Sequence, residues 1–220
     1  MILISGIAWT ITYIGLIYRG FRDRTFGMPL IALALNIAWE FVFSFVYPPD
    51  EAYILVVNCV WFLFDVVIAY TFLRFGYSYW KEAFGVSKAT FRSMFVLAVG
   101  GALLIMLTGA EFFGGLGGFF RDSPVEASRF IACLQNLVMS VGFLAMLWLR
   151  RSSAGQSLLI AVSKTIGTSL TVGIFYLSDH RDNWQFIAVV IGLTLVFDLI
   201  YCVAIYRQLR IDGHNPFRRI

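Results

Sequence analysis

The sequence predicts an all-α integral membrane protein built as a bundle of seven transmembrane helices. Of its 220 residues, 60% are hydrophobic and only 14% are charged, whereas soluble domains usually carry about 25% charged residues. Seven apolar segments approach the ~20 residues that a helix needs to span a bilayer. The connections between them are too short to hold a soluble domain, so a single transmembrane domain over residues 1–220 is expected.

The first helix is expected at 1–18. It starts directly in an apolar run without a basic stretch or a cleavage signal, so we interpret it as a retained helix. The second opens with GMPLIA, the third contains FDVVI, the sixth opens with GQSLLIA and the seventh contains FDLIY. The remaining ranges are 28–47, 52–75, 94–113, 128–149, 157–177 and 184–206.

The matching motifs at the start of the second and sixth helices, and within the third and seventh, suggest an internal repeat. The paired helices run in the same direction. A parallel repeat of two three-helix units joined by the fourth helix, a 3+1+3 arrangement, is therefore expected. The loop charges give an orientation, because cytoplasmic loops are enriched in Lys and Arg. Basic residues follow the first, third, fifth and seventh helices, which predicts an external or lumenal N-terminus and a cytoplasmic C-terminus.

Four charged residues lie well inside the predicted helices: Glu40, Asp65, Lys164 and Asp198. At 1.5 Å of rise per residue, each lies about 10–18 Å from the cytoplasmic helix end, near the bilayer midplane. Charges at this depth are costly and usually functional. The alternative is structural: Lys164 forms an ion pair with Asp65 or Asp198. Because three acids face one lysine, at least one carboxyl group should stay protonated, as a general acid requires.

Polar and aromatic residues accompany these acids. Asn36 stands four residues before Glu40, and Trp61 stands four residues before Asp65, so each pair shares a helix face. Aromatic rings stabilise cations without attacking them, although lipid contact explains most aromatic residues in a membrane protein. The candidates for binding and orienting a substrate are Asn36, Trp39, Trp61, Tyr201 and Trp9.

Several motifs are missing from the sequence. No G-x-S-x-G or H-E-x-x-H occurs, and no aspartate-rich magnesium motif lies on a helix. Residues 179–182 (DHRD) have D-x-x-D spacing, but they fall in a loop and are interpreted as a solvated turn. We therefore expect no metal and no cofactor. Since the basic residues lie in short membrane-flanking loops, nucleic-acid binding is not expected either.

The chain resembles the membrane-bound terpene cyclases of meroterpenoid and indole-diterpene biosynthesis, and the resemblance covers almost its whole length. Asn-x-x-Trp-Glu and Phe-Asp-x-Ile-Tyr on separate helices are its most specific elements in combination. The motifs that carry it are RGFRD at 19–23, GMP at 27–29, LNIAWEF at 35–41, WFLFD at 61–65, GQS at 155–157, KTIGT at 164–168, FDLIY at 197–201 and NPFRRI at 215–220.

The resemblance implies a metal-independent enzyme. It would cyclise a linear prenyl chain, often epoxidised, on an aromatic, polyketide or indole head. It also implies two catalytic acids, Glu40 and Asp198, and functional coupling to a prenyltransferase and an epoxidase. The partners would be the lipophilic substrate and membrane lipids. The expected location is the endoplasmic reticulum of a eukaryote or the plasma membrane of a bacterium.

Two other functions fit parts of the pattern. A small seven-helix transporter would use the carboxylates as a proton relay, but the first and fifth helices lack mid-helix prolines as hinges. A retinal protein would use Lys164 with Asp65 as counter-ion, but the lysine lies on the sixth rather than the last helix. The aromatic residues near the acids also count against the transporter.

Overall fold

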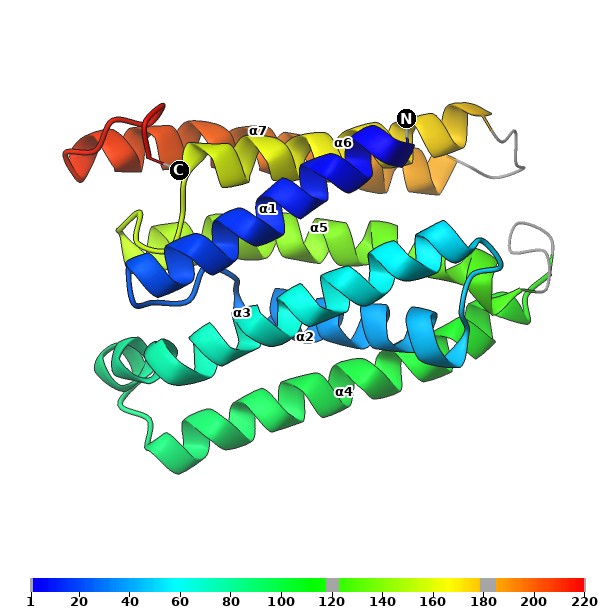
Figure 1. Cartoon of the computed structure of the whole chain (residues 1–220), viewed down its shortest axis with the longest axis horizontal. Coiled ribbons are helices and arrows are strands. Elements are labelled where there is room, and N and C mark those ends of the chain that lie inside the picture. The colour runs from blue at the N-terminus through cyan, green and yellow to red at the C-terminus, as the bar shows by residue number, and fades with distance from the viewer. Residues whose placement is uncertain (1, 118–122, 179–184, 220) are drawn as a thin grey trace.

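Seven α-helices that alternate in direction form the described part of the chain in this computed structural model (Figure 1). The structure describes the backbone of residues 2–117, 123–178 and 185–219, and the side chains of residues 3–117, 123–168 and 185–219. Residues 179–182, interpreted above as a solvated turn, lie outside the described part. The helices are α1 (Ile2–Arg22), α2 (Leu30–Phe41), α3 (Ala52–Phe84), α4 (Lys88–Gly114), α5 (Pro124–Arg150), α6 (Leu158–Ser178) and α7 (Gln185–Ile211).

Each half of the bundle has a helix that packs against two others. In the first half, α3 contacts α1 and α2; in the second, α7 contacts α5 and α6. Between the halves, α1 lies against α6 and α2 against α5, while α4 packs on α2 and α5. Figure 1 shows α1, α6 and α7 together along one side and α4 along the opposite side.

The helix surfaces have the apolar character of a lipid-facing protein. Of the described helices, α3, α4, α5 and α7 are long and apolar enough to cross a membrane. On α4, Leu97 is 73% exposed and Leu104 is 64% exposed. Exposed apolar area on this scale marks contact with a membrane or a partner. The all-helical membrane architecture expected from the sequence is therefore confirmed.

The expected loop at 76–90 is largely helical, which corrects the predicted end of the third helix. Helix α3 continues to Phe84, because Trp80 packs against Phe72 at 6.2 Å and against Phe91 at 6.0 Å between ring centroids. Gly85 then adopts a left-handed conformation (φ 66°) and ends the helix. Ser87 begins α4 by accepting a hydrogen bond from the Thr90 amide at 3.0 Å.

A short π-helical segment, Val42–Val46, follows α2 directly. The Tyr47 amide donates to the Val42 carbonyl at 2.9 Å, five residues earlier, which widens the last turn. Such π turns occur often at functional sites. This one begins two residues after Glu40.

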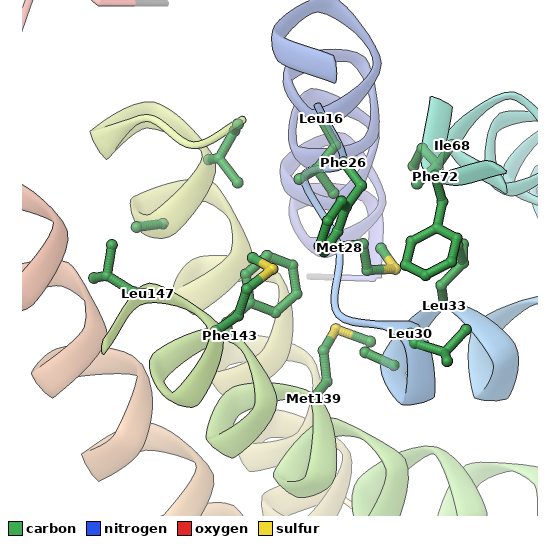
Figure 2. Close-up of a cluster of buried hydrophobic side chains, with 14 of the residues drawn as sticks. Leu16, Phe26, Met28, Leu30, Leu33, Ile68, Phe72, Met139, Phe143 and Leu147 are labelled. Carbon is green, nitrogen blue, oxygen red and sulfur yellow. The ribbon is translucent and has the colours of Figure 1, made fainter. Parts of the chain in front are cut away.

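The largest apolar cluster fills the bundle near the end where α1 leads into α2. Figure 2 shows side chains from α1, the α1–α2 connection, α2, α3 and α5 meeting there. Met28, Leu33, Phe72 and Phe143 are completely buried. This cluster fixes the start of α2, and with it the position of the polar residues farther along that helix.

A polar clasp closes the same end of the bundle. Asp23, after α1, accepts hydrogen bonds from the Gly155 amide at 2.8 Å and the Arg219 guanidinium at 2.9 Å, and it pairs with Arg19. Asp212, after α7, accepts a hydrogen bond from the Ser153 amide at 2.7 Å. The clasp, made by these residues, joins the α1–α2 connection, the α5–α6 connection and the C-terminal tail.

Candidate active site

Glu40 lies at the end of a chain of hydrogen bonds inside the bundle. The Tyr13 hydroxyl, from α1, donates to Glu40 Oε1 at 2.5 Å. Asn36 Nδ2 donates to the Tyr13 hydroxyl at 2.9 Å, and Gln135 Nε2 from α5 donates to Asn36 Oδ1 at 2.5 Å. All four side chains are buried. Asn36 therefore positions Glu40 through Tyr13 rather than by direct contact.

Asp65 is the second acid of this cluster. Its carboxyl group is fully buried and lies within hydrogen-bonding reach of the Glu40 carboxyl group. Among the described residues, no well-formed hydrogen bond reaches either oxygen of Asp65 or Oε2 of Glu40, although the uncharged Asn36 amide lies near the Asp65 carboxyl group. The two carboxyl groups of α2 and α3 thus face each other in surroundings without a cation.

Aromatic rings surround the hydroxyl that contacts Glu40. The Tyr13 ring lies 6.0 Å from Trp9, 6.0 Å from Trp61 and 6.1 Å from Phe64, measured between centroids. The Trp61 indole N–H donates to the Thr10 hydroxyl at 3.1 Å, which fixes that ring. The structure brings Trp9 and Trp61, two of the candidate substrate-binding residues, close to the acid cluster.

Lys164 and Asp198 form a separate cluster between α6 and α7. Lys164 Nζ lies 2.5 Å from Asp198 Oδ1 and donates to the Ser140 hydroxyl at 2.7 Å. The Thr168 hydroxyl donates to Asp198 Oδ2 at 2.6 Å. Lys164 therefore pairs with Asp198 and not with Asp65, which decides between the two partners left open by the sequence. Among the described residues, no hydrogen bond or ion pair joins this cluster to Glu40 or Asp65.

Two of the expected orienting residues lie elsewhere. The Trp39 indole N–H donates to the Ser128 carbonyl at 3.0 Å, and its ring packs at a tilt of 53° against Phe43, 5.3 Å away between centroids. The Tyr201 hydroxyl donates to the Gln156 side chain, close to the clasp. Trp39 precedes Glu40 in the chain but points away from it, because the side chains of adjacent helix residues point about 100° apart.

Tyr13 was not singled out by the sequence analysis as a site residue. It lies four residues after Trp9, on the same face of α1. That spacing was the one available signal, and it does not distinguish a buried hydroxyl from a lipid-facing aromatic ring.

The two clusters differ in chemical capacity. Glu40 and Asp65 can hold a proton away from water beside aromatic rings, which suits protonation of an apolar substrate. Lys164 and Asp198 compensate each other's charge, as buried ions must. No group of three metal-ligating side chains occurs within the described ranges.

The sequence is similar to those of known proteins. A family model described as Pyr4-like transmembrane terpene cyclases matches residues 1–210. Asnovolin H synthase nvfL of Aspergillus novofumigatus is 34% identical over 166 residues, which cover 76% of this chain and 64% of that protein. Terpene cyclase ascF of Acremonium egyptiacum is 30% identical over 221 residues, covering 92% and 78%. Terpene cyclase pyr4 of Aspergillus fumigatus is 28% identical over 184 residues, covering 83% and 71%. No solved structure matches the chain.

Proposed function

The chain belongs to the Pyr4-like transmembrane terpene cyclases, and from that premise we propose that it cyclises a linear prenyl chain attached to an aromatic, polyketide or indole head. Family membership confirms the resemblance drawn from the sequence motifs and identifies the chain as an integral membrane protein of a terpene cyclase family. The proposal concerns the substrate, the reaction steps and the residues that perform them.

The observation that carries the proposal is the Glu40–Asp65 pair, buried beside Trp9, Trp61 and Tyr13. Glu40 protonates the epoxide oxygen, or a terminal alkene where no epoxide is present. With an epoxide, the O–H bond of the acid breaks as the hydroxyl forms, and the C–O bond opens to leave a carbocation. Successive alkenes attack that centre and close the rings.

The last carbocation loses a proton or is captured by a nucleophile of the head group. Proton gain and proton loss balance, so the product is an isomer of the substrate and no oxidant or reductant is consumed. General-acid catalysis contributes roughly 10²–10⁴-fold. Holding a flexible prenyl chain in a folded shape contributes much of the rest.

Asp198 has a different role in this proposal. Since Lys164 and Thr168 occupy both of its oxygens, it is an electrostatic support for positive charge in the bundle and not the partner that shares the Glu40 proton. The substrate enters sideways from the lipid. An upstream prenyltransferase and an epoxidase supply it.

The remaining expectations extend the proposal to the whole bundle. The N-terminus faces the exterior or lumen and the C-terminus the cytoplasm, in the endoplasmic reticulum of a eukaryote or the plasma membrane of a bacterium. The helix pairing supports two parallel three-helix units joined by α4, because the contacts of α3 with α1 and α2 match those of α7 with α5 and α6.

The test uses membranes that contain the protein and a synthetic phenol carrying an epoxidised farnesyl chain. Product is separated by chromatography and identified by its unchanged mass. Wild type should convert the compound, and Glu40→Gln should abolish conversion, because the amide has similar size but no acidic proton. Glu40→Asp should retain part of the activity.

The matched control is Glu111→Gln, since the Glu111 side chain is exposed at the end of α4, where it accepts a hydrogen bond from Tyr47. It should react at the wild-type rate. Wild-type turnover by well-expressed Glu40→Gln would remove Glu40 from the role of acid.

A further inference from the structure

The two polar clusters occupy corresponding places in the two halves of the bundle. Helix α2 begins at Leu30 and α6 at Leu158, each three residues after the glycine of its opening motif. In this register Asn36 corresponds to Lys164, and Glu40 corresponds to Thr168. When the Phe-Asp motifs of α3 and α7 are aligned, Asp65 corresponds to Asp198.

The contacts follow this correspondence. Asp198 accepts hydrogen bonds from two residues one helical turn apart on α6, Lys164 and Thr168. Asp65 faces the equivalent pair on α2, where Glu40 takes the place of Thr168 and lies within hydrogen-bonding reach. The first and fifth helices also correspond, because the Tyr13 hydroxyl accepts a hydrogen bond from Asn36 and the Ser140 hydroxyl accepts one from Lys164.

The decisive difference lies at the position of the lysine. In the second half an ammonium group neutralises Asp198, whereas in the first half an uncharged amide, Asn36, stands at that position. Asp65 consequently has no cation; the uncharged Asn36 amide lies near its carboxyl group, and among the described residues no well-formed hydrogen bond reaches its oxygens or Glu40 Oε2. Two facing carboxyl groups without a cation beside them must share at least one proton, since two buried like charges in contact are strongly unfavourable.

We propose that Asp65 is the positioning residue of the acid: it holds the reactive proton jointly with Glu40, and Asn36 keeps this site active by leaving the lysine position of the repeat without a charge. The inference rests on the proposed function of Glu40 as proton donor. It adds a role for Asp65 that is distinct from the ion-paired role of Asp198.

Few titratable groups surround the pair. Helix α1 contributes Tyr13, α5 contributes the uncharged Gln135 through Asn36, and α4 has no titratable residue between Arg92 and Glu111. A change of the pair's protonation with pH therefore reports on Glu40, Asp65 and Tyr13.

The experiment compares Asp65→Asn with Asp198→Asn and Asn36→Lys, each checked for expression and a single peak in detergent. In Asp65→Asn, the amide N–H donates to an ionised Glu40 carboxylate, so the acid is lost near neutral pH and restored by acidification. Activity should fall at least about tenfold near pH 7.5 and return to within about threefold of wild type near pH 5.5. Asp65→Glu should keep measurable activity near neutral pH because the shared proton remains.

The other two variants should lack this acid rescue. Asn36→Lys recreates the ion pair of the second half and keeps Asp65 ionised beside Glu40. This variant should therefore be inactive at both pH values. Asp198→Asn leaves the acid pair intact, so its activity relative to wild type should be the same at both. Equal losses for Asp65→Asn at the two pH values, or wild-type rates for Asn36→Lys, would overturn the proposal.

A measurement without substrate separates this inference from the proposed function. Infrared spectra of the wild-type protein should contain the carbonyl band of a protonated carboxylic acid near neutral pH. In Asp65→Asn that band should appear only on acidification. A wild-type protein that has the band but forms no cyclised product would refute the proposed function alone, whereas absence of the band would refute the shared proton.

Discussion

Removing the lysine of the buried ion pair should strongly destabilise the protein. In Lys164→Met the ammonium is lost while the side chain keeps nearly the same length. Asp198 is then left with one hydrogen bond, from Thr168, inside a site where its side chain is only 1% exposed. Ser140 also loses the donor that it accepts from in the wild type.

The magnitude follows from this burial. Breaking a buried ion pair costs roughly 3–5 kcal/mol because an uncompensated charge remains. Unfolding entropy is about 2.1 cal/mol/K per residue, so a chain of 220 residues should lose about 6–11 °C in Tm. The double variant Lys164→Met/Asp198→Leu replaces both charges by apolar groups and should recover most of this loss, since such exchanges are often neutral or stabilising.

The assay is thermal unfolding in one detergent, followed by tryptophan fluorescence, for wild type, both single variants and the double variant. The single variants should each be destabilised and the double variant should be more stable than either. A Tm for Lys164→Met within about 2 °C of wild type would refute the reasoning. So would a double variant that loses the sum of the two single losses.

Three further predictions concern topology, metal dependence and the clasp. A glycosylation or protease-access tag after the C-terminus should report a cytoplasmic location, and modification on the outer side would reverse the orientation. Cyclisation should persist in EDTA because no acidic metal motif lies on a helix; loss of activity that added Mg²⁺ restores would require another initiation chemistry. Arg219→Ala should lower Tm by roughly 2–4 °C, because it removes contacts to Asp23 and to the carbonyls of Ser153 and Gln156. The exposed neighbour Arg218 is the matched control: if Arg218→Ala is as destabilising as Arg219→Ala, the clasp has no specific role.

Helix number and the identity of the buried charges were predictable from the sequence because both depend on composition and helical rise. Apolar length predicts a spanning helix, and Glu40, Asp65, Lys164 and Asp198 stand out because charges are rare at such depth. The extension of α3 was not predictable in this way. It depends on Trp80 packing against residues of two helices, and hydropathy carries no information on that contact.

The partners of the charged residues also required the structure. The sequence left Lys164 with two candidate carboxylates at similar depth, and only the neighbouring positions of α6 and α7 select Asp198. Trp39 is adjacent to Glu40 in the chain but contacts Ser128 instead. Tyr13, on a different helix, supplies the hydroxyl that Glu40 accepts from. Rotation of each helix about its axis decides these contacts, and a single sequence constrains that rotation only weakly.

The clasp has a consequence for the motions available to the bundle. A carrier that works by alternating access rocks one group of helices against another and opens each end in turn. Here Asp23, in the α1–α2 connection, accepts hydrogen bonds from the Gly155 amide and from Arg219 of the tail. Elements of both halves are therefore held together at one end. Rocking would have to release two partners of one carboxylate at once, the Gly155 amide and the Arg219 guanidinium. A conformational change that separates the two halves therefore has to break these contacts at the clasped end.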